Sequence, residues 1–220
     1  MELRDAINQR RSIRGYQEAS VSKEEIRQVL ELAVRAVSGV NSQPWEFFVA
    51  AGDKLERLKE YNTAAFRRQD AEDRVDPGVP NGIYRDRSRT VGKALLGAMG
   101  ITREDKKRRA WWGERGFRFF DAPAVLFLLM AASLDETAYR LDMGCVVQNI
   151  TLAAMEKGLG TCVADQAVTY QKGAREILGI PENKRFVVGI AIGYPDEGFA
   201  ANQVISEREP IENITTWCGF

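Results

Sequence analysis

The stretch AVLFLLMAA, residues 124–132, decides the fold, because it is apolar at every position over a length typical of a strand. Side chains of a strand alternate between the two faces of a sheet, so a run without polar residues predicts a strand buried on both faces. A second run, RFVVGIAIGYP at residues 185–195, predicts another buried strand followed by a turn. Shorter strands are expected at residues 46–50 and 161–164. These runs together predict a sheet whose faces are covered.

The segment between the two runs contains the longest predicted helix, residues 135–157, which spans about 34 Å. Its apolar residues lie all round the helix axis: Val146, Val147, Ile150, Leu152, Ala153, Ala154 and Met155. A helix with this pattern is enclosed on every side, and a chain of 220 residues would struggle to enclose it alone. We therefore expect a second copy of the chain, which makes the protein a homodimer.

Another helix begins at Ser22, because Glu25 three residues later completes a capping box and Val21 can pack against Ile26. The glycine of Ser38-Gly39 suits a left-handed end, so this helix is expected to stop there. The remaining predicted helices cover residues 2–9, 53–68, 90–99, 102–118 and 171–178.

The composition indicates one globular domain over residues 1–220, with 45% apolar and 28% charged residues. Lysine plus arginine and aspartate plus glutamate both number 31, so no global field attracts nucleic acid or an anionic membrane. No apolar run approaches the roughly 20 residues that span a bilayer, and the N-terminus carries no signal segment. We expect a cytoplasmic protein without a nucleic-acid or membrane partner.

The sequence contains no histidine, which removes the commonest general base and metal ligand. Serine–histidine and cysteine–histidine nucleophiles are therefore excluded, and an enzyme of this sequence would depend on a cofactor for its chemistry. The three cysteines, Cys145, Cys162 and Cys218, lack the spacing of a disulfide framework or a zinc site. No metal site is expected.

Residues 10–14 concentrate anion-binding groups, since Arg10, Arg11, Ser12 and Arg14 fall within five positions. A guanidinium can hold a phosphate through two parallel hydrogen bonds, and a hydroxyl adds a third donor. The alternative is a solvated basic face. The loop at residues 38–45 is similarly rich in amides and hydroxyls; these suit the edge of a flat heteroaromatic ring, although a plain helix-to-strand turn is the alternative.

Residues 69–118 are predicted to form a lid insertion, because the polar stretch from 69 to 90 is long for an ordinary connection. The basic run at residues 106–109 is interpreted as a solvated face. Trp111 and Trp112, which follow it, are better candidates for contact with substrate or for packing between subunits.

Several motifs together make the sequence resemble the FMN-dependent nitroreductase family: residues 10–14, residues 38–45, Gln148-Asn149 leading into residues 158–162, residues 192–195, and Arg208-Glu209-Pro210. Residues 119–123 and the ending Cys218-Gly219-Phe220 look most like the branch that acts on nitrobenzoates and nitrophenols. The resemblance implies an α+β fold with a mixed, mainly antiparallel sheet flanked by helices. It also implies an intertwined homodimer with two FMN molecules at the interface.

Carried over by position, the resemblance assigns the FMN phosphate to Arg10, Ser12 and Arg208, with Arg11 assisting. Arg14 would face N1 and the C2 carbonyl of the flavin. Asn41 and Gln43 would contact the ribityl chain or the pyrimidine edge. Ser38 and Gly39 would line the flavin ring in the partner's site. The backbone near Gln166 and Ala167 would approach flavin N5. The sequence departs from the family at this last loop, where some members have an acidic residue and a glycine in place of Ala167 and Val168.

The activity implied by the resemblance is ping-pong reduction of nitroaromatic compounds or quinones with NADH or NADPH, in which the flavin and no side chain does the chemistry. Two alternatives have the same fold: a flavin-dependent reductive dehalogenase and a flavin-consuming enzyme. An alternative of a different class is a non-catalytic protein that binds, stores or senses FMN. A dimer without any cofactor is a further alternative.

Overall fold

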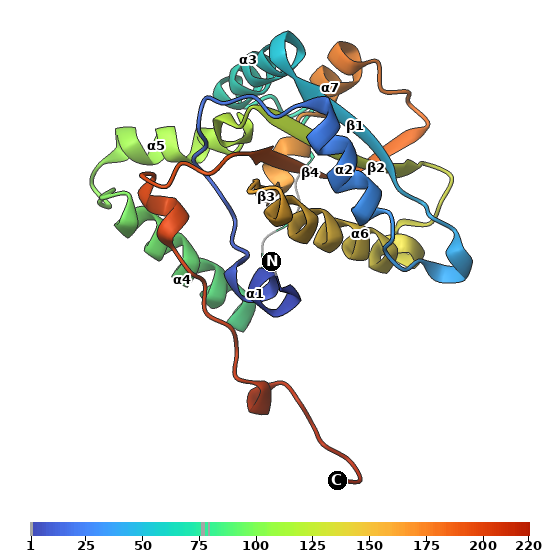
Figure 1. The fold of residues 1–220 in the computed structure, drawn as a ribbon. Helices are drawn as coiled ribbons and strands as arrows, with labels where there is room; N and C mark the ends of the chain where they lie inside the picture. The colour runs from blue at the N-terminus through green and yellow to red at the C-terminus, as the bar shows by residue number, and fades with distance from the viewer. Residues whose placement is uncertain (1, 76–77, 79) are drawn as a thin grey trace.

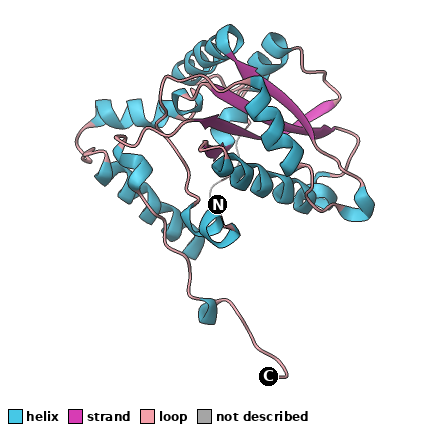
Figure 2. Ribbon diagram, viewed as in Figure 1, coloured by secondary structure: helices cyan, strands magenta, loops and turns pink. Residues whose placement is uncertain are grey.

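A four-stranded sheet with strand order β1-β2-β4-β3 forms the centre of the computed structural model, which describes residues 2–75, 78 and 80–220 (Figures 1 and 2). The strands are β1 (Glu46–Ala51), β2 (Ala124–Ala131), β3 (Gly160–Ala164) and β4 (Lys184–Gly193). All three strand pairs are antiparallel, and a separate parallel bridge joins Ser12 to Thr161. The predicted α+β fold with a mainly antiparallel sheet is confirmed.

Strand β2 is buried on both faces, as its apolar run predicts. Leu126, Leu128 and Met130 pack into one apolar cluster, whereas Val125, Phe127 and Leu129 pack into another. The first cluster includes residues of α2 and α6, and the second includes residues of α3 and α7. The sheet therefore lies between two layers of helices (Figure 1).

The helices are α1 (Leu3–Gln9), α2 (Lys23–Ala33), α3 (Gly52–Arg68), α4 (Gly82–Ala98), α5 (Lys106–Arg115), α6 (Glu136–Glu156) and α7 (Gln171–Leu178). Short 3-10 turns are η1 (Gly39–Asn41), η2 (Phe119–Asp121), η3 (Asp165–Val168), η4 (Ala200–Gln203) and η5 (Ile211–Asn213). The predicted capping box of α2 is confirmed, because Ser22 and Glu25 each bind the other's backbone N–H. Among the described residues, none of these helices is both long and apolar enough to cross a membrane.

Three predicted helix boundaries were wrong. Helix α2 ends at Ala33 rather than near Ser38. Val37 is 73% exposed, so no burial of its side chain stabilises a longer helix. Helix α4 begins at Gly82 rather than at residue 90, and only Leu95 of its residues is buried, so its sequence shows no clear period. Helix α5 is shorter than residues 102–118, because the side chain of Asp105 caps its N-terminus.

In this single chain, α6 is enclosed along one side only. Val146, Ile150 and Ala154 are fully buried, but Leu141 is 74% exposed and Gln148 is also exposed. Part of its apolar surface is thus left open.

Helices α4 and α5 lie to one side of the sheet, next to the chain around η4 (Figure 1). Beyond η4, the chain passes along α4 as far as Glu209, which pairs with Arg87, and then runs out from the rest of the molecule to the C-terminus (Figure 1). The tail is rich in exposed apolar side chains: Ile205, Ile211, Ile214, Trp217 and Phe220.

Candidate functional site

The arginine-rich segment, residues 10–14, runs along β3 at the edge of the sheet. The amide of Ile13 donates a 2.9 Å hydrogen bond to the carbonyl of Thr161, and the Ile13 side chain is buried. A Cβ on Gly160 would lie 2.4 Å from Ile13, so a glycine is needed for this close approach. Because side chains alternate along an extended segment, Ser12 and Arg14 point away from the side that Ile13 occupies.

Three of the predicted anion-binding residues influence the pKa of one buried thiol. Burial raises the pKa of Cys162, and the nearby Arg14, Ser12 and Arg10 act in the opposite direction. Ser12 also forms a bridge with Thr161, the neighbour of Cys162 in β3, so this part of the segment lies against the sheet.

Arg11 carries a donor that the described residues leave unsatisfied. Its Nε atom is buried and has no hydrogen-bond partner among the residues that the structure describes. Arg10 and Arg11 line a cavity of about 200 Å³ together with Thr151, Gly158 and Thr161. Buried polar groups in folded proteins are nearly always paired, so the segment fits an anionic group such as a phosphate.

Arg14 is fixed through its backbone. Its amide donates a 2.7 Å hydrogen bond to Oδ1 of Asn202, and its carbonyl accepts a 2.8 Å bond from Arg115. Its guanidinium donates to the carbonyl of Ser12 at 3.3 Å and lies 5.9 Å from the ring centroid of Phe120. The sequence interpretation missed Asn202 and Arg115. The position of Arg115 in the sequence, between the aromatic pairs Trp111-Trp112 and Phe119-Phe120, could have indicated that it is buried.

The turn at η2 is held in an unusual conformation. Phe119, Phe120 and Asp121 have φ angles of 56°, 54° and 61°, and none is glycine. The left-handed region costs such residues roughly 1–2 kcal/mol each. Arg115 and Arg118 both bind the carboxylate of Asp121, which offsets part of this cost.

The amide-rich loop after α2 is attached to α6. Gly39 donates its amide to Asp142 at 3.2 Å, while the amide of Gln43 donates to Oγ of Ser38 at 3.1 Å. Gln43 also donates through Nε2 to the carbonyl of Asn41, and both residues are exposed. The sequence interpretation missed Asp142, although a carboxylate between Leu141 and Met143 is a visible sign.

Within one chain, the loop and the arginine-rich segment lie near different parts of α6. The loop binds Asp142, whereas Thr151 lines the cavity with Arg10 and Arg11. Nine residues of helix correspond to about 13 Å. The structure thus does not bring Ser38, Gly39, Asn41 and Gln43 together with the arginine cluster in a single chain.

The loop predicted to approach flavin N5 is η3. Ala167 is buried against Gly189, where a Cβ would lie 2.3 Å from the Ala167 side chain. The side chain of Gln166 donates a 3.2 Å hydrogen bond to the carbonyl of Gly113 in α5. Both side chains are therefore engaged within the protein, and the prediction that this loop acts through its backbone stays a prediction.

Arg208 lies in the tail. Its guanidinium binds Ser206 and the carbonyl of Glu207, and it lines a cavity of about 400 Å³ beside α4. The neighbouring Glu209 forms a 2.7 Å ion pair with Arg87 of α4. Arg10 lines a different cavity, so the expected convergence of these two arginines stays a prediction.

These features define an α+β protein that presents an anion-binding segment at the edge of a helix-covered sheet. The chain belongs to the nitroreductase family, since the model described as "Nitroreductase family" matches residues 7–194. The predicted resemblance is confirmed.

Known relatives cover nearly the whole chain. It is 32% identical to a 4-nitrobenzoate reductase of Nocardioides sp. (strain LMS-CY), over 99% of this chain and 90% of that protein. It is also 32% identical to a nitrobenzene nitroreductase of Ectopseudomonas oleovorans, over 97% of this chain and 95% of that protein. The crystal structure of the FMN and NADPH-dependent nitroreductase NfnB from "sphigopyxis sp. strain HMH" superposes with a TM-score of 0.92 at 28% identity, covering 100% of both chains.

Proposed function

We propose that this protein is an FMN-dependent oxidoreductase that uses NADH or NADPH to reduce nitroaromatic compounds and related electron-poor acceptors such as quinones. The observation that carries the proposal is the arginine-rich segment along β3, where Arg10 and Arg11 line a cavity of about 200 Å³ and the buried Nε of Arg11 has no hydrogen-bond partner among the described residues. The names of the relatives point to the same acceptors. The absence of histidine also fits an enzyme whose chemistry belongs to a cofactor.

Different residues of the arginine-rich segment bind different parts of FMN. Arg10, Arg11 and Ser12 supply charged and hydroxyl donors for the phosphate. Arg14 holds a positive charge beside the ring, where it stabilises the negative charge that the ring gains on reduction. The bound FMN supplies two-electron transfer between the nicotinamide and the acceptor. The backbone of η3 at Gln166 and Ala167 completes the ring site, and Arg208 reaches the phosphate from the tail.

The complete site is built from two chains. Ser38, Gly39, Asn41 and Gln43 of one chain serve the FMN bound to the arginine cluster of its partner, because the two groups lie near different parts of α6 in a single chain. The open apolar surface of α6 is the surface on which the two copies meet. Two such sites then form at one interface.

The dimer is intertwined through the tail. Strand β1 is an edge of the sheet, and a groove of about 580 Å³ between β1 and α2 is lined mainly by apolar side chains such as Ile26, Leu30 and Phe47. The partner's tail, with its exposed Ile211, Ile214 and Trp217, supplies apolar groups to fill this groove. A paired and covered edge strand is also protected from unwanted association.

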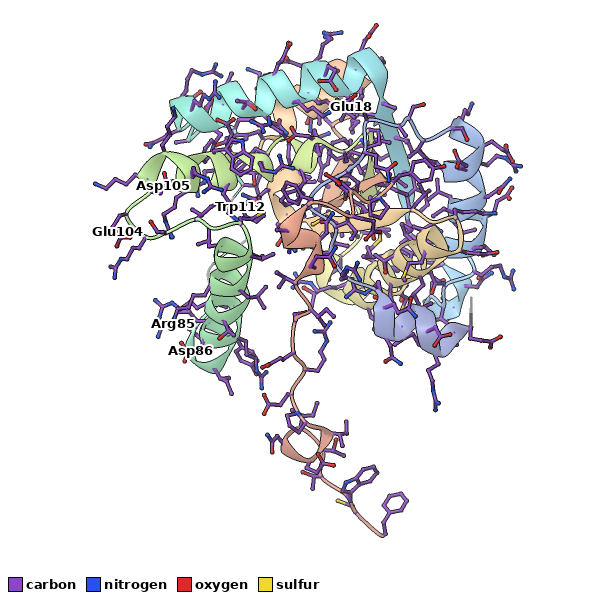
Figure 3. The ribbon with its side chains drawn as sticks, turned by 60° about the vertical axis from the view of Figure 1, so that its left-hand side comes forward. Glu18, Arg85, Asp86, Glu104, Asp105 and Trp112 are labelled. Carbon is purple, nitrogen blue, oxygen red and sulfur yellow. The ribbon has the colours of Figure 1, made fainter. Side chains whose placement is uncertain are left out.

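The segment from residue 69 to 118, of which residues 76, 77 and 79 lie outside the described part of the chain, acts as a lid over the ring, and its α5 carries Trp111 and Trp112. Trp112 is labelled on α5 in Figure 3. Its ring stacks on that of Phe199, in the chain leading to η4, with a distance of 6.5 Å between the ring centroids. The free thiols of Cys145, Cys162 and Cys218 suit a reducing compartment, so we place the reaction in the cytoplasm.

Anaerobic stopped-flow spectroscopy tests this function. We expect the purified chain to take up FMN, to lose its yellow colour on mixing with NADH or NADPH, and to regain it with a nitroaromatic acceptor. A chain that binds FMN but is reduced by neither nucleotide would be a storage protein instead. A chain that takes up no FMN would contradict the proposal entirely.

A further inference from the structure

Arg115, at the end of α5, is a buried charge with an unusual set of partners. Only 7% of the residue is exposed. Its guanidinium lies 5.1 Å from the ring centroid of Trp111 and 4.9 Å from that of Phe199, so aromatic rings cover it. The aromatic cover replaces water around the charge, and the 2.6 Å ion pair with Asp121 compensates it.

Nη2 of Arg115 reaches the segment that carries Arg14, whereas the buried Nε has no hydrogen-bond partner among the described residues. Nη2 donates to the carbonyl of Arg14 at 2.8 Å and to the carbonyl of Phe120 at 3.0 Å. The ring of Phe120 in turn lies against the Arg14 guanidinium. One buried side chain therefore holds both the backbone of Arg14 and the turn whose aromatic ring contacts its charge.

A second contact attaches the same end of α5 to η3. Gln166 of η3 donates to the carbonyl of Gly113, and a Cβ on Gly116 would lie 1.7 Å from Oε1 of Gln166. The last turn of α5 thus packs against both segments that the proposed function places beside the flavin ring.

We infer that Arg115 is a positioning residue, which fixes Arg14 beside the flavin and makes the reduction potential of the flavin depend on the docking of α5. The effect on the reduction potential rests on the proposed function, because it requires bound FMN. The contact between Arg115 and Arg14 is a property of the polypeptide and can be tested without FMN.

The first experiment measures hydrogen exchange in the chain without FMN. In Arg115→Met, we expect the amides of Arg14 and Gly15 to exchange about tenfold faster, because the backbone loses a charged hydrogen-bond donor. The matched control is Arg118→Met, since Arg118 binds the same Asp121 but makes no hydrogen bond to Arg14 among the contacts that the structure describes. Equal exchange in wild type and Arg115→Met, or an equal change in the control, would overturn the inference.

The second experiment measures the midpoint potential of bound FMN in a double-mutant cycle. We expect Arg14→Ala and Arg115→Met each to shift the potential in the negative direction, and Arg115→Met to cause no further shift in the Arg14→Ala background. Equal shifts in both backgrounds would overturn the inference. Arg115→Lys, which keeps the charge but lacks the planar fork, should show the same direction of change if Arg115→Met does not fold. A chain that takes up no FMN would contradict the proposed function, while hydrogen exchange would still decide the role of Arg115.

Discussion

The backbone amide of Gly39 donates a 3.2 Å hydrogen bond to the carboxylate of Asp142, which ties the loop after α2 to α6. Asp142 is only 7% exposed, and the hydroxyl of Ser42 lies 3.4 Å from the same carboxylate oxygen. The loop needs this support, because Val40 and Asn41 both have left-handed backbone conformations, with φ angles of 47° and 60°. The carboxylate thus fixes the shape of a segment that we assign to the partner's flavin.

Replacing Asp142 with alanine should therefore loosen this loop. The loss of a buried, charged hydrogen-bond acceptor is expected to lower the free energy of unfolding by about 1–3 kcal/mol, as measured by urea denaturation. The affinity for FMN should fall in the same variant. Ser42→Ala is the control and should change both quantities less, because its hydroxyl makes the longer bond. Unchanged FMN affinity in a destabilised Asp142→Ala protein would remove the loop from the flavin site.

Arg10→Ala should weaken the binding of FMN but leave the binding of riboflavin unchanged, because riboflavin lacks the phosphate. A charge-assisted hydrogen bond contributes about 1.5–3 kcal/mol, so the dissociation constant for FMN should rise by roughly 10- to 100-fold. Quenching of flavin fluorescence measures both affinities. Arg208→Ala should show the same selectivity if the tail arginine reaches the phosphate.

The control for Arg10 is Arg4→Ala, which removes an exposed arginine from α1 and should affect neither ligand. Equal losses for FMN and riboflavin in Arg10→Ala would show that this arginine does not bind the phosphate.

Much of the fold could be predicted because burial leaves a direct trace in the sequence. Strand β2 packs on both faces, so its run from residue 124 is apolar throughout. The capping box at Ser22 is a local pattern and was found for the same reason. Helix α4 was placed too late because a single buried residue, Leu95, leaves no period to detect.

The candidate site could be predicted only where its chemistry is concentrated in the sequence. Arg10, Arg11, Ser12 and Arg14 stand close together and were visible as a cluster. The residues that hold Arg14 were not, because Asn202 and Arg115 lie 188 and 101 positions away in the chain. Arg115 and Asn202 each bind the backbone of Arg14. Because almost every residue offers the same backbone amide and carbonyl, the identity of Arg14 gives no sign of these two partners.

Leu141→Arg should weaken the dimer. This leucine lies on the open side of α6, where the proposed interface would bury an unpaired charge. We expect the dissociation constant of the dimer to rise by about a hundredfold, which sedimentation velocity over a dilution series would detect. Leu32→Arg on α2 is the control, because Leu32 is also exposed but does not line the groove beside β1. A fully dimeric Leu141→Arg protein would place the interface elsewhere.

Glu25 should make the stability of the protein depend on pH. Hydrogen bonds from Ser22, and then from the hydroxyl of Tyr194, lower the pKa of this carboxyl from 4.5 to about 2. Because the pKa is lower in the folded chain, the stabilisation is present above about pH 4.5 and is lost as the pH falls toward 2. Glu25→Gln can still cap the helix but does not titrate, so its free energy of unfolding should fall short of wild type at pH 7 and approach it near pH 3. Urea denaturation from pH 7 to pH 3 measures this difference, and Ser22→Ala should reduce it by removing the Ser22 hydroxyl, one of three donors that also include the Ser22 amide and the Tyr194 hydroxyl. A difference that stays constant over the whole range would show that Glu25 has no such role.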